Sequence, residues 1–265
     1  MKPILLCRWD SETSEEERKS AELIWGENCC QYRTEVPNNS LVIGRYSVLP
    51  FYVELEKELK LKNCELINNY SQHQFIADME WYEHIKHITP KSFFDVGYAN
   101  VPECENGYVI KGATNSRKAK WNTHMYAKDR SCLPKIMNNL LDDSLISYQK
   151  LVIREYIPLK TFDIGLHGLP ITNEWRFFFL GCVCLTGGYY WTIYDKKEDF
   201  EIPYAALDKA SEAAAILSEY VNFFVVDVAE TEQGDWIVIE VNDGQMSGLS
   251  YTNPHDLYVR LLTEI

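Results

Sequence analysis

Three oxygen-bearing side chains stand out because of their spacing on two apolar segments that flank a polar turn at residues 232–235. A pair of antiparallel strands centred on that turn places Asp227 opposite Glu240. Opposite residues in such a pair have β-carbons about 4.5–5.5 Å apart. Asn242 lies on the same predicted face as Glu240, about 7 Å further along the strand. The spacing therefore predicts that three oxygen ligands converge at one point of a hairpin.

These side chains have the chemistry of a site for a divalent cation. Two carboxylates so close repel each other unless a cation lies between them. A set made only of oxygen ligands suits Mg²⁺ or Mn²⁺ and leaves positions for phosphate oxygens. We therefore interpret Asp227, Glu240 and Asn242 as metal ligands. The alternative is an exposed polar face, but the predicted face also carries apolar residues that favour burial, namely Phe223, Val225, Trp236 and Val238.

Basic side chains that could hold phosphate lie upstream of the hairpin. Lys111 ends a predicted strand just before a basic loop at residues 112–120, a suitable position for holding triphosphate charge. Arg176 shares a strand face with Glu174, and its guanidinium could hold phosphate through two hydrogen bonds. Two ordinary roles stay open at this point, because Lys111 could be an exposed edge lysine and Arg176 could simply pair with Glu174.

The segment at residues 154–157 ends another predicted strand and leads into Pro158. Proline disfavours helix in the residue before it, so the segment is expected to stay extended. An extended backbone offers N–H and C=O groups that can hydrogen-bond the edge of an adenine base. Many strands end in this way, so the signal becomes informative only together with the others.

The elements that would position these residues change in character along the chain. Short strands and amphipathic helices alternate over residues 1–90, which predicts a small α/β domain. Its expected strands are 3–7, 41–43 and 64–67, and its helices are 14–25, opened by a capping box at Ser14, 50–61 and 72–87. After residue 91 the expected strands are 93–96, 108–111, 151–157, 175–180, 182–194, 223–229 and 236–241, with a loop at 112–130 and helices at 133–147, 204–220 and after Pro254.

Composition excludes several classes of protein. The formal net charge of −13 repels a phosphate backbone, so nucleic-acid binding is not expected. No run of eighteen apolar residues exists, the apolar N-terminal stretch is too short for a signal peptide, and none of the eight cysteines forms a C-x-x-C pair. We therefore expect a soluble cytoplasmic protein with reduced thiols. The six histidines show no metal-ligand spacing, and no Ser/His/Asp hydrolase motif is visible.

In this order, the strand ending at Lys111, the segment 153–157, and Asp227 followed by Glu240-Val241-Asn242 resemble the ATP-grasp superfamily of carboxylate–amine ligases. Members include D-alanine–D-alanine ligase and glutathione synthetase. Residues 174–176 and 240–245 are most similar to the R2K clade of bacterial and phage proteins. A eukaryotic cell-division-cycle assembly factor for translation initiation factor 2 is a distant relative.

The resemblance covers residues 91–265 and implies an α/β (α+β) ATP-grasp fold, in which two α+β subdomains clamp ATP. The lysine-strand subdomain would span residues 91–155 and the metal-binding subdomain residues 156–265. Residues 1–90 would form a preceding pre-ATP-grasp α/β domain.

The resemblance also implies a reaction. A substrate carboxylate attacks the γ-phosphoryl group of ATP to give an acylphosphate, and an amine then displaces phosphate to form an amide or peptide bond. Mg²⁺ or Mn²⁺ on the three ligands would neutralise phosphate charge, and Lys111 and Arg176 would be the catalytic cations. The residues implied to bind ATP are Lys111, Lys118, Arg154, Glu155, Tyr156, Ile157, Arg176 and, for the ribose, Asp163.

Two departures from the family pattern concern the phosphate clamp. No motif marks an upstream phosphate-binding lysine, for which Lys86 and Lys91 are candidates. The loop at 113–120 is bordered by a single glycine, so Arg117 or Lys118 would complete the clamp.

The partners expected from the resemblance are small-molecule or peptide carboxylates and amines, with a protein substrate also open, and no membrane. The loop at 243–250 could contact the acceptor or simply connect two elements. A phosphotransferase, a nucleotide-gated assembly factor and a binding protein without catalysis are the alternatives. A phosphotransferase would need no amine, and an assembly factor would need a protein partner.

Overall fold

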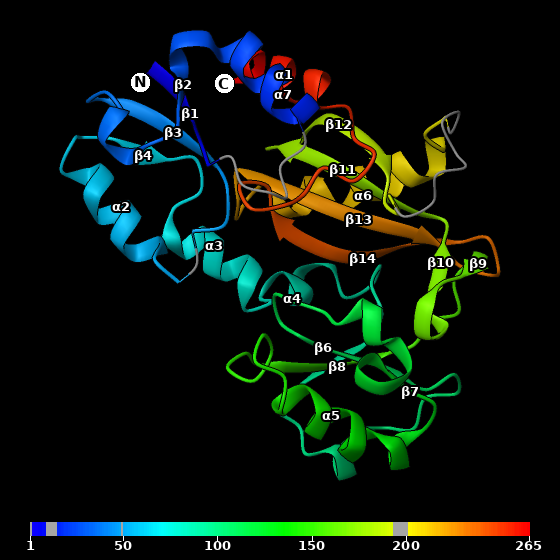
Figure 1. The fold of residues 1–265 in the computed structure, drawn as a ribbon. Coiled ribbons are helices and arrows are strands. Elements are labelled where there is room, and N and C mark those ends of the chain that lie inside the picture. The colour runs from blue at the N-terminus through cyan, green and yellow to red at the C-terminus, as the bar shows by residue number, and fades with distance from the viewer. Residues whose placement is uncertain (1, 9–14, 49, 193–200) are drawn as a thin grey trace.

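The apolar segments at the start of the chain form a parallel sheet of order β2-β1-β3-β4 in the computed structural model, which describes residues 2–8, 15–48, 50–192 and 201–265 (Figure 1). Its strands are β1 (Lys2–Cys7), β2 (Cys29–Cys30), β3 (Ser40–Arg45) and β4 (Glu65–Leu66). Successive side chains of a strand point to opposite faces. Ile4 and Leu6 share a core with α2 (Tyr52–Lys60), whereas Leu5 and Cys7 share another with α1 (Glu15–Trp25).

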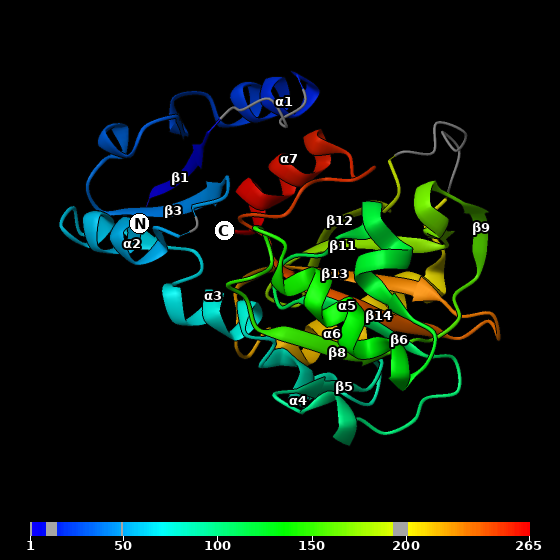
Figure 2. The same cartoon turned by 60° about the horizontal axis from the view of Figure 1, so that its bottom comes forward.

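The helix α7 (Pro254–Glu264) lies beside α1, although the two are far apart in sequence (Figures 1 and 2). It places Leu257, Tyr258 and Leu261 in the same core as Leu5 of the N-terminal sheet. Phe178 of the next sheet joins this core as well. The helix therefore connects two sheets through one continuous apolar contact.

The central sheet is antiparallel, with order β12-β11-β13-β14. Its strands are β11 (Glu174–Leu180), β12 (Val183–Tyr189), β13 (Phe223–Glu230) and β14 (Trp236–Asp243). Phe223 and Val225 face α7, and their neighbours Phe224 and Val226 face the opposite core. That second core also contains α6 (Tyr204–Leu217) and α4 (Trp81–Ile85). Apolar residues on both faces of these strands thus give a sheet that is covered on both sides.

A third unit lies opposite β14 and consists of a sheet of order β5-β8-β6-β7 covered by α5 (Leu133–Leu141) (Figure 1). Its strands are β5 (Ser92–Phe94), β6 (Tyr108–Gly112), β7 (Tyr126–Ala127) and β8 (Leu151–Glu155). A separate hairpin of β9 (Thr161–Ile164) and β10 (Pro170–Thr172) follows β8. The sequence did not predict this hairpin.

Several expected elements differ in extent. The helix predicted at 72–87 is split into α3 (Tyr70–Ala77) and α4, because Met79 takes a left-handed φ of 58°. The helix predicted at 133–147 ends at Leu141, and Asp143 instead accepts a hydrogen bond from the Leu145 N–H. The predicted loop at 112–130 contains two short helical turns and β7. The capping box proposed at Ser14 lies outside the described residues.

The predicted pairing of Asp227 with Glu240 is confirmed, and the pairs from Phe224 to Asp227 keep that register, but the three pairs nearest the turn are shifted by one residue. Val228 pairs with Val238, so Ile239 is an extra residue on β14, a β-bulge. The bulge exchanges the two faces of the strand on its turn side. The prediction that Trp236 and Val238 share the face of Glu240 is therefore wrong, and Val238 packs in the core with Val226.

Within the described residues, no helix is both long enough and apolar enough to cross a membrane.

Candidate active site

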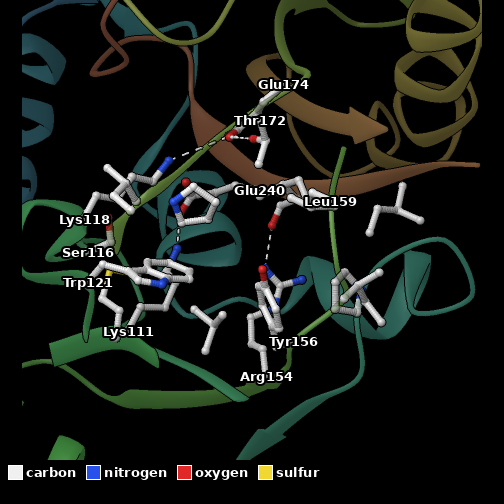
Figure 3. A pocket seen from close by; sticks show the side chains of 18 of the residues that line it. Lys111, Ser116, Lys118, Trp121, Arg154, Tyr156, Leu159, Thr172, Glu174 and Glu240 are labelled. Atoms are coloured by element: carbon white, nitrogen blue, oxygen red, sulfur yellow. Dashed lines mark hydrogen bonds and ion pairs between the residues drawn. The ribbon is translucent and has the colours of Figure 1, made fainter. Parts of the chain in front are cut away.

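A cleft lies between the β5-β8-β6-β7 sheet and the central sheet, and Figure 3 shows the side chains around it. Lys111 comes from β6, Arg154 from β8 and Glu240 from β14, so both sheets contribute. The empty space in the cleft is about 790 Å³, part of which is open to solvent. Apolar side chains line one part of this cleft and charged side chains line another.

One end of the cleft is lined by aromatic and aliphatic side chains. Tyr156 and Trp121 line it, with their rings 6.2 Å apart in an edge-to-face arrangement, and Ile157 and Leu159 lie beside them. The N–H groups of Glu155 and Tyr156 donate to backbone carbonyl oxygens of the same unit. The N–H of Ile157, by contrast, donates to no backbone oxygen within the described chain. A base bound here would find its backbone contact at Ile157.

The opposite end is basic and polar. The Lys111 Nζ contacts Glu240 Oε1 across the cleft, and both side chains are largely withdrawn from water. Burial, followed by the positive charges of Arg154 and Lys118, lowers the pKa of Lys111. The Lys118 Nζ lies 3.7 Å from Glu174 Oε1 and 3.9 Å from the centre of the Tyr190 ring. Four charged groups of the cleft, two cationic and two anionic, thus hold each other in pairs.

Arg154 is unusual because it is buried and holds only neutral acceptors. Its guanidinium donates to the carbonyl oxygen of Ile239 at 2.5 Å, Thr89 Oγ1 at 2.7 Å and Ser92 Oγ at 3.0 Å. No carboxylate contacts it within the described part of the chain. Burial lowers the pKa of Arg154 to about 10. Its positive charge therefore faces the cleft without an anionic partner, and the bulged Ile239 is the residue that it fixes.

The predicted metal ligands meet where β11, β13 and β14 run side by side. Asp227 is fully buried, and both of its oxygens accept hydrogen bonds from Arg176, from Nε at 2.8 Å and from Nη2 at 2.7 Å. Asn242 Nδ2 lies 3.5 Å from Asp227 Oδ2. The Arg176 Nη1 also donates to the carbonyl oxygen of Gly248. Arg176 pairs with Asp227, not with Glu174, because the two are cross-strand neighbours.

Comparison with protein-family models gives one match, to the ATP-grasp domain of R2K clade family 3, over residues 103–262. The chain belongs to this ATP-grasp family. The match includes every sequence-predicted site residue from Lys111 to Asn242. Among curated proteins, no sequence matches.

Solved structures with the ATP-grasp fold are similar over nearly the whole chain. A RimK-domain ATP-grasp protein from Sphaerobacter thermophilus is 13% identical with a TM-score of 0.57, and the match covers 99% of each chain. D-cycloserine synthetase is 12% identical with a TM-score of 0.58, covering 98% of each chain. D-alanine–D-alanine ligase from Bacillus anthracis, in complex with ATP, is 12% identical with a TM-score of 0.53, covering 91% of this chain and 84% of that one. At these identities the likeness establishes the ATP-grasp fold.

The residues of this ATP-grasp site fit a hard divalent cation. In the described chain, no group of three or more His, Cys, Asp or Glu side chains could hold a metal ion. A three-ligand set is reached only with Asn242, whose amide oxygen would turn toward the ion. Each of the two carboxylates is held by a cationic side chain, Asp227 by Arg176 and Glu240 by Lys111. Both carboxylates therefore lie beside positive charge, which a divalent cation would also supply.

The remaining sequence-predicted residues are not all in the cleft. Lys118 lines it, whereas Arg117 points to Asp143 and contacts it from two guanidinium nitrogens. Asp163 is exposed on β9 and is absent from the cleft lining. Lys86 pairs with Glu83 on the exposed side of α4, and Lys91 is also exposed.

Sequence reasoning missed the aromatic wall of the cleft, which Trp121 and Trp191 line. Glu174, expected on the strand face of Arg176, is buried beside this wall, and within the described residues its Oε1 accepts no hydrogen bond. Burial raises the pKa of Glu174, against the opposing effect of the Lys118 charge. A signal for this wall was present in the aromatic run at residues 189–191.

The contact of Arg117 with Asp143 is expected to anchor the basic loop. Asp143→Asn removes a charge-assisted acceptor, so trypsin should cut after Arg117, Lys118 or Lys120 about tenfold faster. The measurement is limited proteolysis followed by mass spectrometry of the fragments. The control is Asp142→Asn, because Asp142 is the exposed neighbour. Equal cleavage of both variants would show that the contact does not anchor the loop.

Proposed function

We propose that this protein is a Mg²⁺-dependent ATP-grasp ligase that joins a carboxylate to an amine through an acylphosphate. The observation that carries the proposal is the pairing of Asp227 with Arg176 and of Glu240 with Lys111 at the polar end of the cleft. These pairs collect two carboxylates and two cations at one place. The two carboxylates have the charge that attracts Mg²⁺, and the two cations have the charge that attracts a triphosphate.

The two ion pairs define what this chain does when a nucleotide binds. Lys111 would then contact a phosphate oxygen, and Glu240, Asp227 and Asn242 would be the residues that hold the metal ion. A bound divalent cation would neutralise phosphate charge at that position. Arg176 keeps Asp227 oriented through its fork of two hydrogen bonds, while its position beside Gly248 keeps the loop after β14 close to the reacting groups.

Other residues position the nucleotide. The apolar end with Tyr156 and Ile157 takes the adenine, and Lys118 and the unpaired charge of Arg154 attract the phosphates. We assign residues 1–90 to a pre-ATP-grasp domain, 91–155 to the lysine-strand subdomain and 156–265 to the metal-binding subdomain. The substrates proposed are small-molecule or peptide carboxylates and amines.

Hydroxylamine trapping tests this proposal without knowledge of the natural amine. The purified protein is incubated with ATP, Mg²⁺, hydroxylamine and one acid at a time from a panel of amino acids, small acids and short peptides. We expect acid-dependent release of ADP together with an acyl hydroxamate, because hydroxylamine intercepts an acylphosphate. EDTA should abolish both signals, because the ligand set requires a divalent cation.

The outcomes separate the competing functions. ADP release with a phosphorylated product and no hydroxamate would replace the ligase by a phosphotransferase. Tight binding of ATP with no turnover on any acid would favour the nucleotide-gated assembly factor. Equal ATP affinity with Mg²⁺ and with EDTA, measured by calorimetry, would contradict the metal assignment.

A further inference from the structure

A second hollow adjoins the polar end of the cleft, on the side of the N-terminal sheet. Its lining comes from three parts of the chain, namely Ser47, His73, Ile76 and Ala77, then 113–115, then 241–243, Met246 and Ser247. It borders a hollow that contains Arg176 and Glu240, and the residues common to both are Thr114, Asn115, Asn242, Met246 and Ser247. A molecule in the second hollow would therefore lie directly beside the groups assigned to the metal and phosphates.

The charge of this hollow differs from that of the cleft. The cleft contains Lys111, Lys118 and Arg154, whereas no lysine or arginine lines the second hollow among the described residues. Its ionisable side chains are His73 and Asp243. A carboxylate placed here would meet a carboxylate and no cation, which is unfavourable. An amine would meet acceptors.

His73 is held in one orientation. Its Nδ1 lies 3.1 Å from Asp243 Oδ2, and its ring stacks on Tyr52 with centroids 4.5 Å apart and planes 14° apart. Asp243 Oδ1 is fixed in turn by the side chain of Asn68 at 2.9 Å and the backbone N–H of Gln245 at 3.0 Å. With Nδ1 beside the Asp243 carboxylate, Nε2 is the ring nitrogen that makes no hydrogen bond within the described part of the chain.

We propose that the second hollow is the subsite for the amine substrate, and that Nε2 of His73 accepts a hydrogen bond from its nitrogen. The inference rests on the proposed ligase function. Ile76, Val241 and Met246 give the hollow an apolar wall, so the substrate class is a small primary amine with an aliphatic body. The hydrogen bond would hold the amine nitrogen in the hollow that His73 and Asn242 both line. His73 therefore makes this hollow bind the amine substrate and not the carboxylate substrate.

Binding of two simple probes tests the inference without any turnover. Glycinamide has a primary amine and no carboxylate, and N-acetylglycine has a carboxylate and no primary amine. The protein is prepared with isotope-labelled histidine, the spectrum of His73→Gln identifies the His73 imidazole signals, and each probe is added with Mg²⁺ and a non-hydrolysable ATP analogue. We expect glycinamide to shift the His73 signals and N-acetylglycine to leave them unchanged.

Calorimetry provides the quantitative arm. His73→Gln should weaken glycinamide binding about tenfold or more, because a hydrogen bond to a charged group is lost. Asp243→Asn should weaken it as well, since it removes the carboxylate that fixes the ring. His87→Gln makes the same substitution at an exposed histidine and should change nothing. Circular dichroism confirms that each variant is folded.

A stronger response of His73 to N-acetylglycine, or none to glycinamide, would overturn the assignment of the hollow. So would equal glycinamide affinity of His73→Gln and His87→Gln. Failure of the ligase proposal is distinguishable, because it appears as an absence of hydroxamate in wild-type protein whatever the probes do.

Discussion

Glu240→Gln and Asp227→Asn are each expected to lower turnover at least about a hundredfold, because a group that stabilises transition-state charge contributes roughly 2.7–4 kcal/mol. Their effects on stability should differ. The Glu240 side chain is partly accessible to solvent. When it is replaced, the Lys111 amine can turn into the cleft, so Glu240→Gln should fold normally. Asp227 is fully buried against Arg176, and loss of one partner of a buried pair costs about 3–5 kcal/mol. ADP release measures the first effect and thermal or urea denaturation the second.

Glu232→Gln is the matched control, because Glu232 is exposed in the turn of the same hairpin. It should leave both turnover and stability near wild type. Near-normal ADP release by Glu240→Gln would remove Glu240 from the ligand set. A denatured Glu240→Gln protein would show that its contact with Lys111 is needed for folding, contrary to the assignment.

Arg176→Lys is expected to reduce turnover at least about a hundredfold while ATP affinity changes much less. Lysine keeps the positive charge but cannot reproduce the fork that donates to both oxygens of Asp227 and to Gly248. Loss of this orientation misplaces the reacting groups, which lowers kcat more than it weakens nucleotide binding. Measured kcat and the calorimetric Kd for Mg–ATP give the comparison.

Arg260→Lys, at an exposed arginine of α7, controls for the substitution itself. If Arg176→Lys loses stability but keeps turnover, Arg176 serves only to bury Asp227. If ATP affinity falls as far as turnover, Arg176 binds the ground state and the transition state equally.

The pairing of β13 with β14 at Asp227 and Glu240 was predictable because the signals for it are local. Three polar residues and Gly234 mark the turn, Gly234 adopts a left-handed φ of 91°, and the strands beside it are apolar enough to fix their pairing. The register at Asp227 and Glu240 follows from counting outward. The bulge at Ile239 did not follow, since an unpaired residue in a run of Ile and Val has no distinct pattern.

Contacts between distant segments lay beyond sequence reasoning. Arg176 was expected to share a strand face with Glu174, but its partner is set by β11 lying next to β13, which no local pattern specifies. The same holds for Lys111 with Glu240, residues 129 apart in sequence. The break at Met79 required a left-handed backbone that methionine seldom adopts, so periodicity alone predicted one long helix there.

The packing of α7 against the N-terminal sheet has a consequence for how the chain folds during synthesis. One face of β1 and β3 buries Leu5 and Ile43 against Leu257 and Leu261, so that face stays incomplete until α7 has left the ribosome. Contacts of such sequence separation form slowly, because a long loop must close first. During translation the β2-β1-β3-β4 sheet is therefore synthesised before α7 but completes its core only after α7 is available. Its apolar face needs protection until then.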